Sequence, residues 1–73
     1  MTQPYDPARD LEAMLSPREA AAFLSSTVRT LEAWRNRGEG PPYYRPSANR
    51  VRYKRRDLIE YLEQSRVTPR AAA

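Results

Sequence analysis

Two helix-start signals lie close together near the beginning of the chain, and they limit what the segment around them can form. Ser16-Pro17-Arg18-Glu19 has the form of a capping box, with proline at the first helical position. Thr27 is the best cap for a second helix, with Ser26 as the alternative one residue earlier. The sequence therefore predicts two short helices joined by a tight polar turn.

The first of these helices carries one apolar stripe. Pro17, Ala20, Ala21 and Leu24 fall at the i, i+3, i+4 and i+7 positions of a helix, and Phe23 extends the stripe. The small alanine side chains allow another helix to cross close by.

The second helix is predicted to run from about Val28 to Arg37 and to end where Gly38 supplies a left-handed stop. Leu31 and Trp34 share one face and are predicted to point into the core. The opposite, outward face is formed by Arg29, Glu32, Ala33 and Asn36.

A turn and a β-hairpin are predicted next. Both glycines of the chain and two of its prolines lie in residues 36–42, which indicates a rigid turn. Residues 43–45 and 50–53 are strand candidates rich in aromatic and β-branched residues, separated by a loop at residues 46–49. Val51 and Tyr53 are predicted to face the core, and the alternating arginines to face outward.

A last helix is predicted to open at residues 54–57 and to fade near Ser65. Leu58, Tyr61 and Leu62 lie at helical spacing and are predicted to close the core. We expect a single domain at residues 14–65, in which order begins at Leu15. We expect a flexible N-terminal arm at residues 1–13 and a flexible tail at residues 66–73.

Basic charge is concentrated in the middle of the chain. Residues 29–56 carry nine bases against two acids, whereas the segments on either side are weakly acidic. Twelve of the thirteen bases are arginine, which binds phosphate and guanine in bidentate fashion better than lysine does. A polyanion is therefore the natural partner, with a solvated surface as the alternative explanation.

The missing residue types narrow the possible functions. The chain has no cysteine and no histidine, which excludes a disulfide framework and a zinc site built from these residues. Its carboxylates are scattered, so we expect no catalytic site, no metal and no cofactor. No apolar run approaches the roughly 18 residues of a membrane span, and the N-terminus lacks the pattern of a signal peptide. We therefore expect a cytoplasmic protein with no membrane partner.

In order along the chain, these segments resemble the excisionase and MerR-like branch of winged helix-turn-helix domains, which includes small phage excisionases and AlpA-like regulators. The family pattern is Leu-(Ser/Thr)-x-x-Glu-Ala-Ala, Thr-Leu-x-x-Trp, Gly-x-x-Pro, Val-Arg-Tyr and Asp-Leu. It stands here at residues 15–21, 30–34, 38–41, 51–53 and 57–58. The resemblance implies a mainly α fold with a small β-hairpin. The helix starting at Val28 would enter the major groove of DNA, and the hairpin from Tyr43 to Tyr53 would be the wing.

The chain departs from this pattern at two places. The turn between the two helices usually carries a glycine and then an apolar residue, where this chain has Ser25 and Ser26. One apolar anchor is thereby lost. The loop at residues 46–49 is long for a wing tip and lacks the usual glycine.

Contacts to bases are predicted on the outward face of the second helix. Arg29, near its N-terminus, is the best candidate for contacting guanine N7 and O6, and Ala33 is small enough to approach a thymine methyl group. Val28 has two alternatives, a core position or a groove contact. Glu32 either accepts a hydrogen bond from cytosine or, more simply, pairs with a neighbouring arginine.

Contacts to the DNA backbone are predicted around this helix and on the hairpin. The hydroxyls of Thr27 and Thr30 suit a phosphate at the helix N-terminus. Arg45, Asn49 and Arg50 would approach a minor groove or its phosphates, with a solvated hairpin as the alternative. The full predicted set is Arg18, Thr27, Val28, Arg29, Thr30, Ala33, Arg35, Arg37, Arg45, Asn49, Arg50, Arg52 and Lys54.

The leading hypothesis is sequence-specific binding of double-stranded DNA, as an excisionase that directs recombination or as a small transcriptional regulator. One short helix and a wing offer a small interface, so we expect a monomer that binds repeated sites beside copies of itself. Arg45 or Arg50 of one copy would meet Glu19 of the next, and an integrase or RNA polymerase would be the further partner. The alternative is a protein-interaction module, an antirepressor or adaptor that acts on another regulator.

Overall fold

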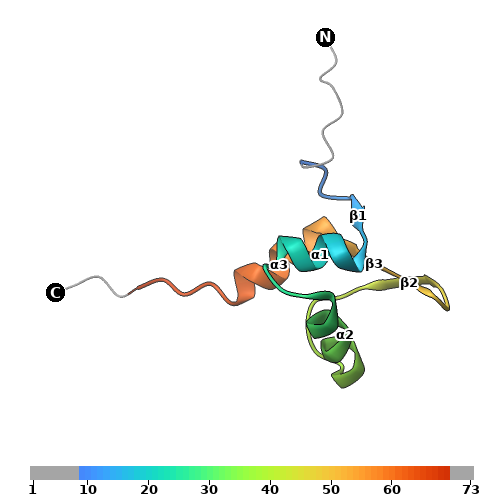
Figure 1. Cartoon of the computed structure of the whole chain (residues 1–73). Coiled ribbons are helices and arrows are strands. Elements are labelled where there is room, and N and C mark those ends of the chain that lie inside the picture. The colour runs from blue at the N-terminus through green and yellow to red at the C-terminus, as the bar shows by residue number, and fades with distance from the viewer. Residues whose placement is uncertain (1–8, 70–73) are drawn as a thin grey trace, which may run out of the picture.

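The computed structural model describes residues 9–69, and over this range three helices pack against a three-stranded antiparallel sheet (Figure 1). In chain order the elements are β1 (Met14–Leu15), α1 (Pro17–Phe23), α2 (Val28–Arg37), β2 (Tyr44–Ser47), β3 (Arg50–Lys54) and α3 (Arg55–Gln64). The strand order is β1-β3-β2. This is a winged helix-turn-helix fold, as the sequence predicts, with the β2–β3 hairpin projecting away from the helices.

Both predicted helix starts are confirmed, because each depends on contacts between near neighbours. Ser16 Oγ accepts a hydrogen bond from the Glu19 amide at 3.1 Å, and the Glu19 carboxylate accepts one from the Ser16 amide at 2.9 Å. Thr27 Oγ1 accepts from the Thr30 amide at 3.1 Å. Thr27, and not the alternative Ser26, is therefore the cap of α2.

The ends of α1 and α2 have the same geometry but different residues. After α2 the left-handed position is Gly38, at φ 70°, and the amides of Gly38 and Glu39 close the helix. After α1 the same position is Ser25, at φ 53°. The Ser25 and Ser26 amides donate to the carbonyls of Ala22 and Ala21, the pairing of a Schellman motif. Ser25 thus adopts after α1 the left-handed conformation that Gly38 adopts after α2.

A small apolar core lies where α1, α2 and α3 meet β3. Its buried members are Leu15, Ala20, Ala21, Leu31, Val51, Tyr53 and Leu58. Ala20 and Ala21 are buried as predicted, and they allow α1 to lie close to α2. Val51 and Tyr53 point inward from β3 while Arg50 is exposed, which confirms the predicted alternation.

One apolar prediction on the helices holds in part and another needs correction. Trp34 packs against the core as predicted, but it is only half-buried, and its ring lies 5.9 Å from the ring of Tyr61. Leu62 does not close the core, since 40% of its surface is exposed. Leu62 belongs to the last turn of α3, which extends past α1 (Figure 1).

The hairpin has a shorter tip than predicted. Residues 46 and 47 belong to β2, and only Ala48 and Asn49 form the turn, so the expected four-residue loop is wrong. Pro46 fits in β2 because this is an edge strand, which needs no amide donor on its outer side. The register shifts between Tyr44 and Ser47, which places a bulge in β2.

The segment before α1 is tied to the sheet and to α3. Met14 and Leu15 pair with Lys54 and Tyr53 to form β1. The amides of Arg55 and Arg56 donate to the carbonyls of Ala13 and Leu11, each at 2.9 Å. These bonds satisfy amides in the first turn of α3, because its N-cap residue, Lys54, makes no side-chain hydrogen bond that caps the helix. Regular contacts thus begin before Leu15. Of the two predicted flexible segments, residues 1–8 and 70–73 lie outside the described range.

Candidate nucleic-acid interface

The N-terminal half of α2 presents most of the side chains predicted to contact bases. Arg29 is exposed, and Ala33 is half-buried one turn further along the helix. Val28 is 42% exposed, so of its two alternatives the core position does not hold. The capping contacts fix this end of the helix, with the Thr27 hydroxyl donating to the Thr30 hydroxyl at 3.0 Å. The first turn of α2 is therefore a rigid surface with an arginine and two hydroxyls.

The two arginines in the last turn of α2 have partners within the chain. Arg37 Nε lies 3.2 Å from a carboxylate oxygen of Glu39, in an exposed ion pair. Arg35 is half-buried, and its Nη1 donates to the hydroxyl of Tyr53 at 2.7 Å. Both residues were predicted to contact DNA from charge alone.

The hairpin carries a second group of exposed basic and polar side chains. Arg45, Asn49 and Arg50 are all exposed. Arg45 Nη1 reaches the carbonyl of Ala48 at 3.4 Å, which holds the guanidinium beside the tip. Arg52 is half-buried and donates to the carbonyl of Val51 at 2.7 Å. The tip therefore offers two exposed arginines to a partner.

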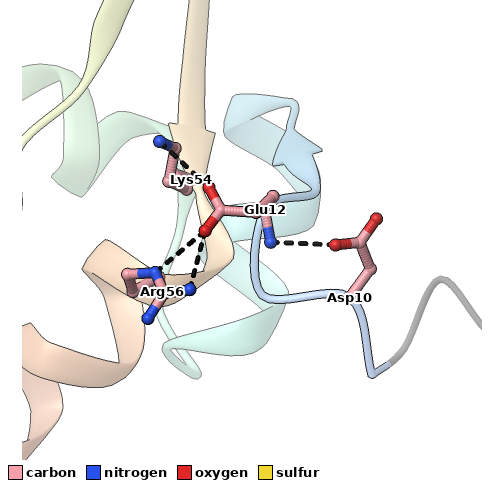
Figure 2. A network of polar contacts seen from close by, with 4 residues as sticks. All are labelled: Asp10, Glu12, Lys54 and Arg56. Carbon is pink, nitrogen blue, oxygen red and sulfur yellow. Dashed lines mark hydrogen bonds and ion pairs between the residues drawn. The ribbon is translucent and has the colours of Figure 1, made fainter.

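Lys54 and Arg56 share one carboxylate, that of Glu12 (Figure 2). Lys54 Nζ lies 3.2 Å from Glu12 Oε2, and Arg56 donates to Oε1 through Nε at 3.1 Å and Nη2 at 2.7 Å. The Glu12 amide donates to Asp10 Oδ1 at 2.9 Å, which orders the turn that carries Glu12. A DNA phosphate approaching Lys54 would thus meet a lysine that already has an anionic partner.

The pKa values of this network shift in the directions that its contacts require. Hydrogen bonds from Arg56 and then Lys54 lower the pKa of Glu12 below its usual 4.5. The Tyr44 hydroxyl, followed by Glu12, raises the pKa of Lys54. The Lys54 ammonium also lies 5.3 Å from the centre of the Tyr44 ring.

Tyr43 is the main residue of the basic surface that sequence reasoning did not select. Its ring centre lies 5.7 Å from the guanidinium carbon of Arg35 and 5.8 Å from that of Arg45. It also lies 6.1 Å from the ring of Tyr53. The signal that could have identified it is the interleaving of tyrosine with arginine in residues 43–45 and 52–53.

The predicted site residues thus fall into two main groups on the described structure. One group lies on the first turns of α2 and the other on the hairpin, with Arg35 between them. Arg18 lies apart on the exposed side of α1, and Lys54 lies at the end of β3 that pairs with β1. A hollow of about 270 Å³ beside α3 is lined by Asp57 and Glu60, so its charge does not suit a polyanion.

Residues 14–66 match a family model described as a helix-turn-helix domain. The match runs from β1 to just beyond α3 and so covers every helix and strand described above. The chain belongs to this helix-turn-helix domain family. The family consists of small, excisionase-like DNA-binding domains. No curated protein and no solved structure matches the chain.

In this helix-turn-helix domain, α1 and α2 are the paired helices, and α2 is the second of the pair. The β2–β3 hairpin is the wing. Across residues 9–69, no helix is long and apolar enough to cross a membrane. Over the same residues, no group of three or more Asp, Glu, His or Cys side chains is arranged to hold a metal ion.

Proposed function

We propose that this helix-turn-helix protein binds double-stranded DNA sequence-specifically, without catalysis. The observation that supports this proposal most strongly is the exposed N-terminal turn of α2, where Arg29 projects from a capped helix end in a DNA-binding family. In helix-turn-helix proteins this end of the second helix contacts base edges in the major groove.

On this proposal the residues of α2 divide into base and phosphate contacts. Arg29 binds a guanine through N7 and O6, and Ala33 lies against a thymine methyl group. Val28 makes an apolar groove contact from its exposed position. Thr27 and Thr30 lie at the helix N-terminus, where hydroxyl and amide groups suit a phosphate.

The wing supplies the second contact. Arg45, Asn49 and Arg50 lie at or near its tip and would enter the adjacent minor groove or bind its phosphates. Phosphate contacts position the protein without carrying sequence information, so these arginines contribute affinity more than specificity.

We propose that the biological role is that of an excisionase or a small transcriptional regulator. Either role fits a domain that occupies DNA together with neighbouring copies and an integrase or RNA polymerase.

Contact between neighbouring copies is proposed to use opposite charges. Arg45 or Arg50 of one copy would meet Glu19 of the next. Glu19→Gln tests this contact cleanly, because glutamine keeps the capping box and removes the charge. Cooperative binding should then disappear while single-site affinity persists, and retained cooperativity would exclude the pairing.

Salt dependence tests the DNA-binding proposal itself. About six phosphate contacts predict a slope near −5 for the logarithm of the binding constant against the logarithm of salt concentration. Fluorescence anisotropy with a labelled duplex measures this slope. Arg50→Ala should reduce its magnitude by about 1. Arg66→Ala, which removes an exposed arginine beyond α3 that lies 3.7 Å from Glu63, should leave it unchanged. A wild-type slope near zero would refute DNA binding and favour a protein-interaction module.

A further inference from the structure

A cluster of two arginines and two tyrosines joins α2 to the wing. It consists of Arg35 on α2, Tyr43 in the segment before β2, Arg45 on β2 and Tyr53 on β3. Arg35 donates to the Tyr53 hydroxyl at 2.7 Å, and both guanidinium groups lie within 5.8 Å of the Tyr43 ring centre. The two tyrosine rings are 6.1 Å apart. We call this set the Arg–Tyr cluster.

The Arg–Tyr cluster has one fixed end. Tyr53 is 1% exposed and belongs to the core, so its hydroxyl occupies a constant position. Arg35 reaches this hydroxyl from α2 and at the same time lies beside the Tyr43 ring. A planar guanidinium can donate in its own plane while an aromatic ring lies beside it, which an ammonium group cannot reproduce. The Tyr43 ring also lies beside the guanidinium of Arg45 on the wing.

We propose that the Arg–Tyr cluster holds the wing at a set position relative to α2, so that Arg35 and Tyr53 are positioning residues for DNA binding. This inference rests on the proposed function, because positioning matters only when α2 and the wing contact one duplex. A wing held in place beforehand loses less conformational entropy when α2 and the wing bind adjacent grooves of one duplex. Arg35 acts on affinity through the wing, in place of a direct phosphate contact.

Tyr53→Phe tests the proposal, since it removes the acceptor of Arg35 and keeps the ring that fills the core. Binding is measured on a duplex long enough for both elements and on a short duplex that α2 alone can contact. We expect affinity for the long duplex to fall by about three- to tenfold, the size of one hydrogen bond, and affinity for the short duplex to be unchanged. Tyr61→Phe is the matched control, because it removes the hydroxyl of a tyrosine outside the cluster that packs on Trp34. It should change neither affinity.

The free protein provides a second readout. Residual dipolar couplings of backbone amides report the orientation of α2 relative to the hairpin, and this orientation should become averaged in Tyr53→Phe but not in Tyr61→Phe. If Tyr53→Phe does not fold, Arg35→Gln at a half-exposed position allows the same comparison.

The outcomes separate the two proposals. If the substitution lowers affinity equally for both duplexes, Arg35 contacts DNA directly and the positioning role is overturned. Unchanged affinity for the long duplex would also overturn the positioning role. If the wild-type protein binds neither duplex, the proposed function fails, and unchanged dipolar couplings in Tyr53→Phe would then refute the cluster's structural role as well.

Discussion

Gly40 is a position where the addition of a single methyl group should destabilise the protein. Gly40 has φ 85°, and a Cβ atom placed there would lie 2.9 Å from Cε3 and 3.1 Å from Cβ of Trp34. Trp34 is anchored in α2 and packs against Tyr61, so it cannot simply move away. Gly40→Ala therefore combines a backbone cost with a steric overlap.

Gly38→Ala separates these two costs. Gly38 has a similar φ of 70°, but a Cβ atom there would meet nothing within 4 Å. An alanine in this conformation costs about 1 kcal/mol once the lost flexibility of glycine in the unfolded chain is counted. Steric overlap with a packed side chain, as with Trp34 at Gly40, adds about 1–3 kcal/mol. We expect a loss of about 1 kcal/mol for Gly38→Ala and about 2–4 kcal/mol for Gly40→Ala.

Urea unfolding measures both losses through the fluorescence of Trp34, the single tryptophan of the chain. In thermal unfolding, each kcal/mol corresponds to a shift in Tm of about 4–8 °C for a domain of this size. Equal losses for the two variants would refute the argument, because they would mean that the Gly40–Trp34 approach contributes nothing beyond backbone conformation.

Two further substitutions test the turn and the charge network. Ser25→Gly should stabilise the protein by about 0.5–1 kcal/mol in urea unfolding, because φ 53° suits glycine better than serine. Ser26→Gly is the control and should not stabilise it. A lower stability of Ser25→Gly would show that the backbone of Ser25 is not strained. Because the pKa of Glu12 is lowered below 4.5 in the folded state, its ionised form stabilises the fold above that pH and this contribution disappears as the pH falls further. Glu12→Gln should therefore be less stable than the wild-type protein at pH 7, with the difference shrinking below about pH 4.5; a difference that stays constant down to pH 3 would exclude the linkage.

The elements that the sequence predicted well are those specified by near neighbours. The caps at Ser16 and Thr27 and the stop at Gly38 involve residues within one or two turns, so the boundaries of α2 were predicted correctly. The buried faces of α1 and β3 follow from simple periodicity in the same way.

The features that the sequence did not predict depend on contacts between distant segments. β1 has only two residues and therefore no periodicity, and it exists because β3 offers it a partner. The sequence predicts Pro46 in a loop, but it lies in β2, where a proline is tolerated because this is an edge strand. The exposure of Leu62 depends on how far α3 extends beyond the core, which a helical pattern does not reveal.

Within the candidate site, charge alone selected the basic residues of α2 and the hairpin, but it did not reveal which partner each side chain has within the chain. Arg35 has a tyrosine partner 18 residues away, and Arg56 has a carboxylate partner 44 residues away. Neither separation corresponds to a local pattern. The role of Tyr43 was missed for the same reason, since its cation contacts reach Arg35 on another element.

A parallel selection experiment tests whether the first turn of α2 recognises bases. Wild-type protein and Arg29→Ala would each select binding sites from the same pool of random duplex DNA. We predict that the wild-type motif contains a guanine whose preference, worth about 1–3 kcal/mol, disappears in Arg29→Ala while the other positions persist. If both proteins select the same motif with the same strength at every position, Arg29 does not recognise a base.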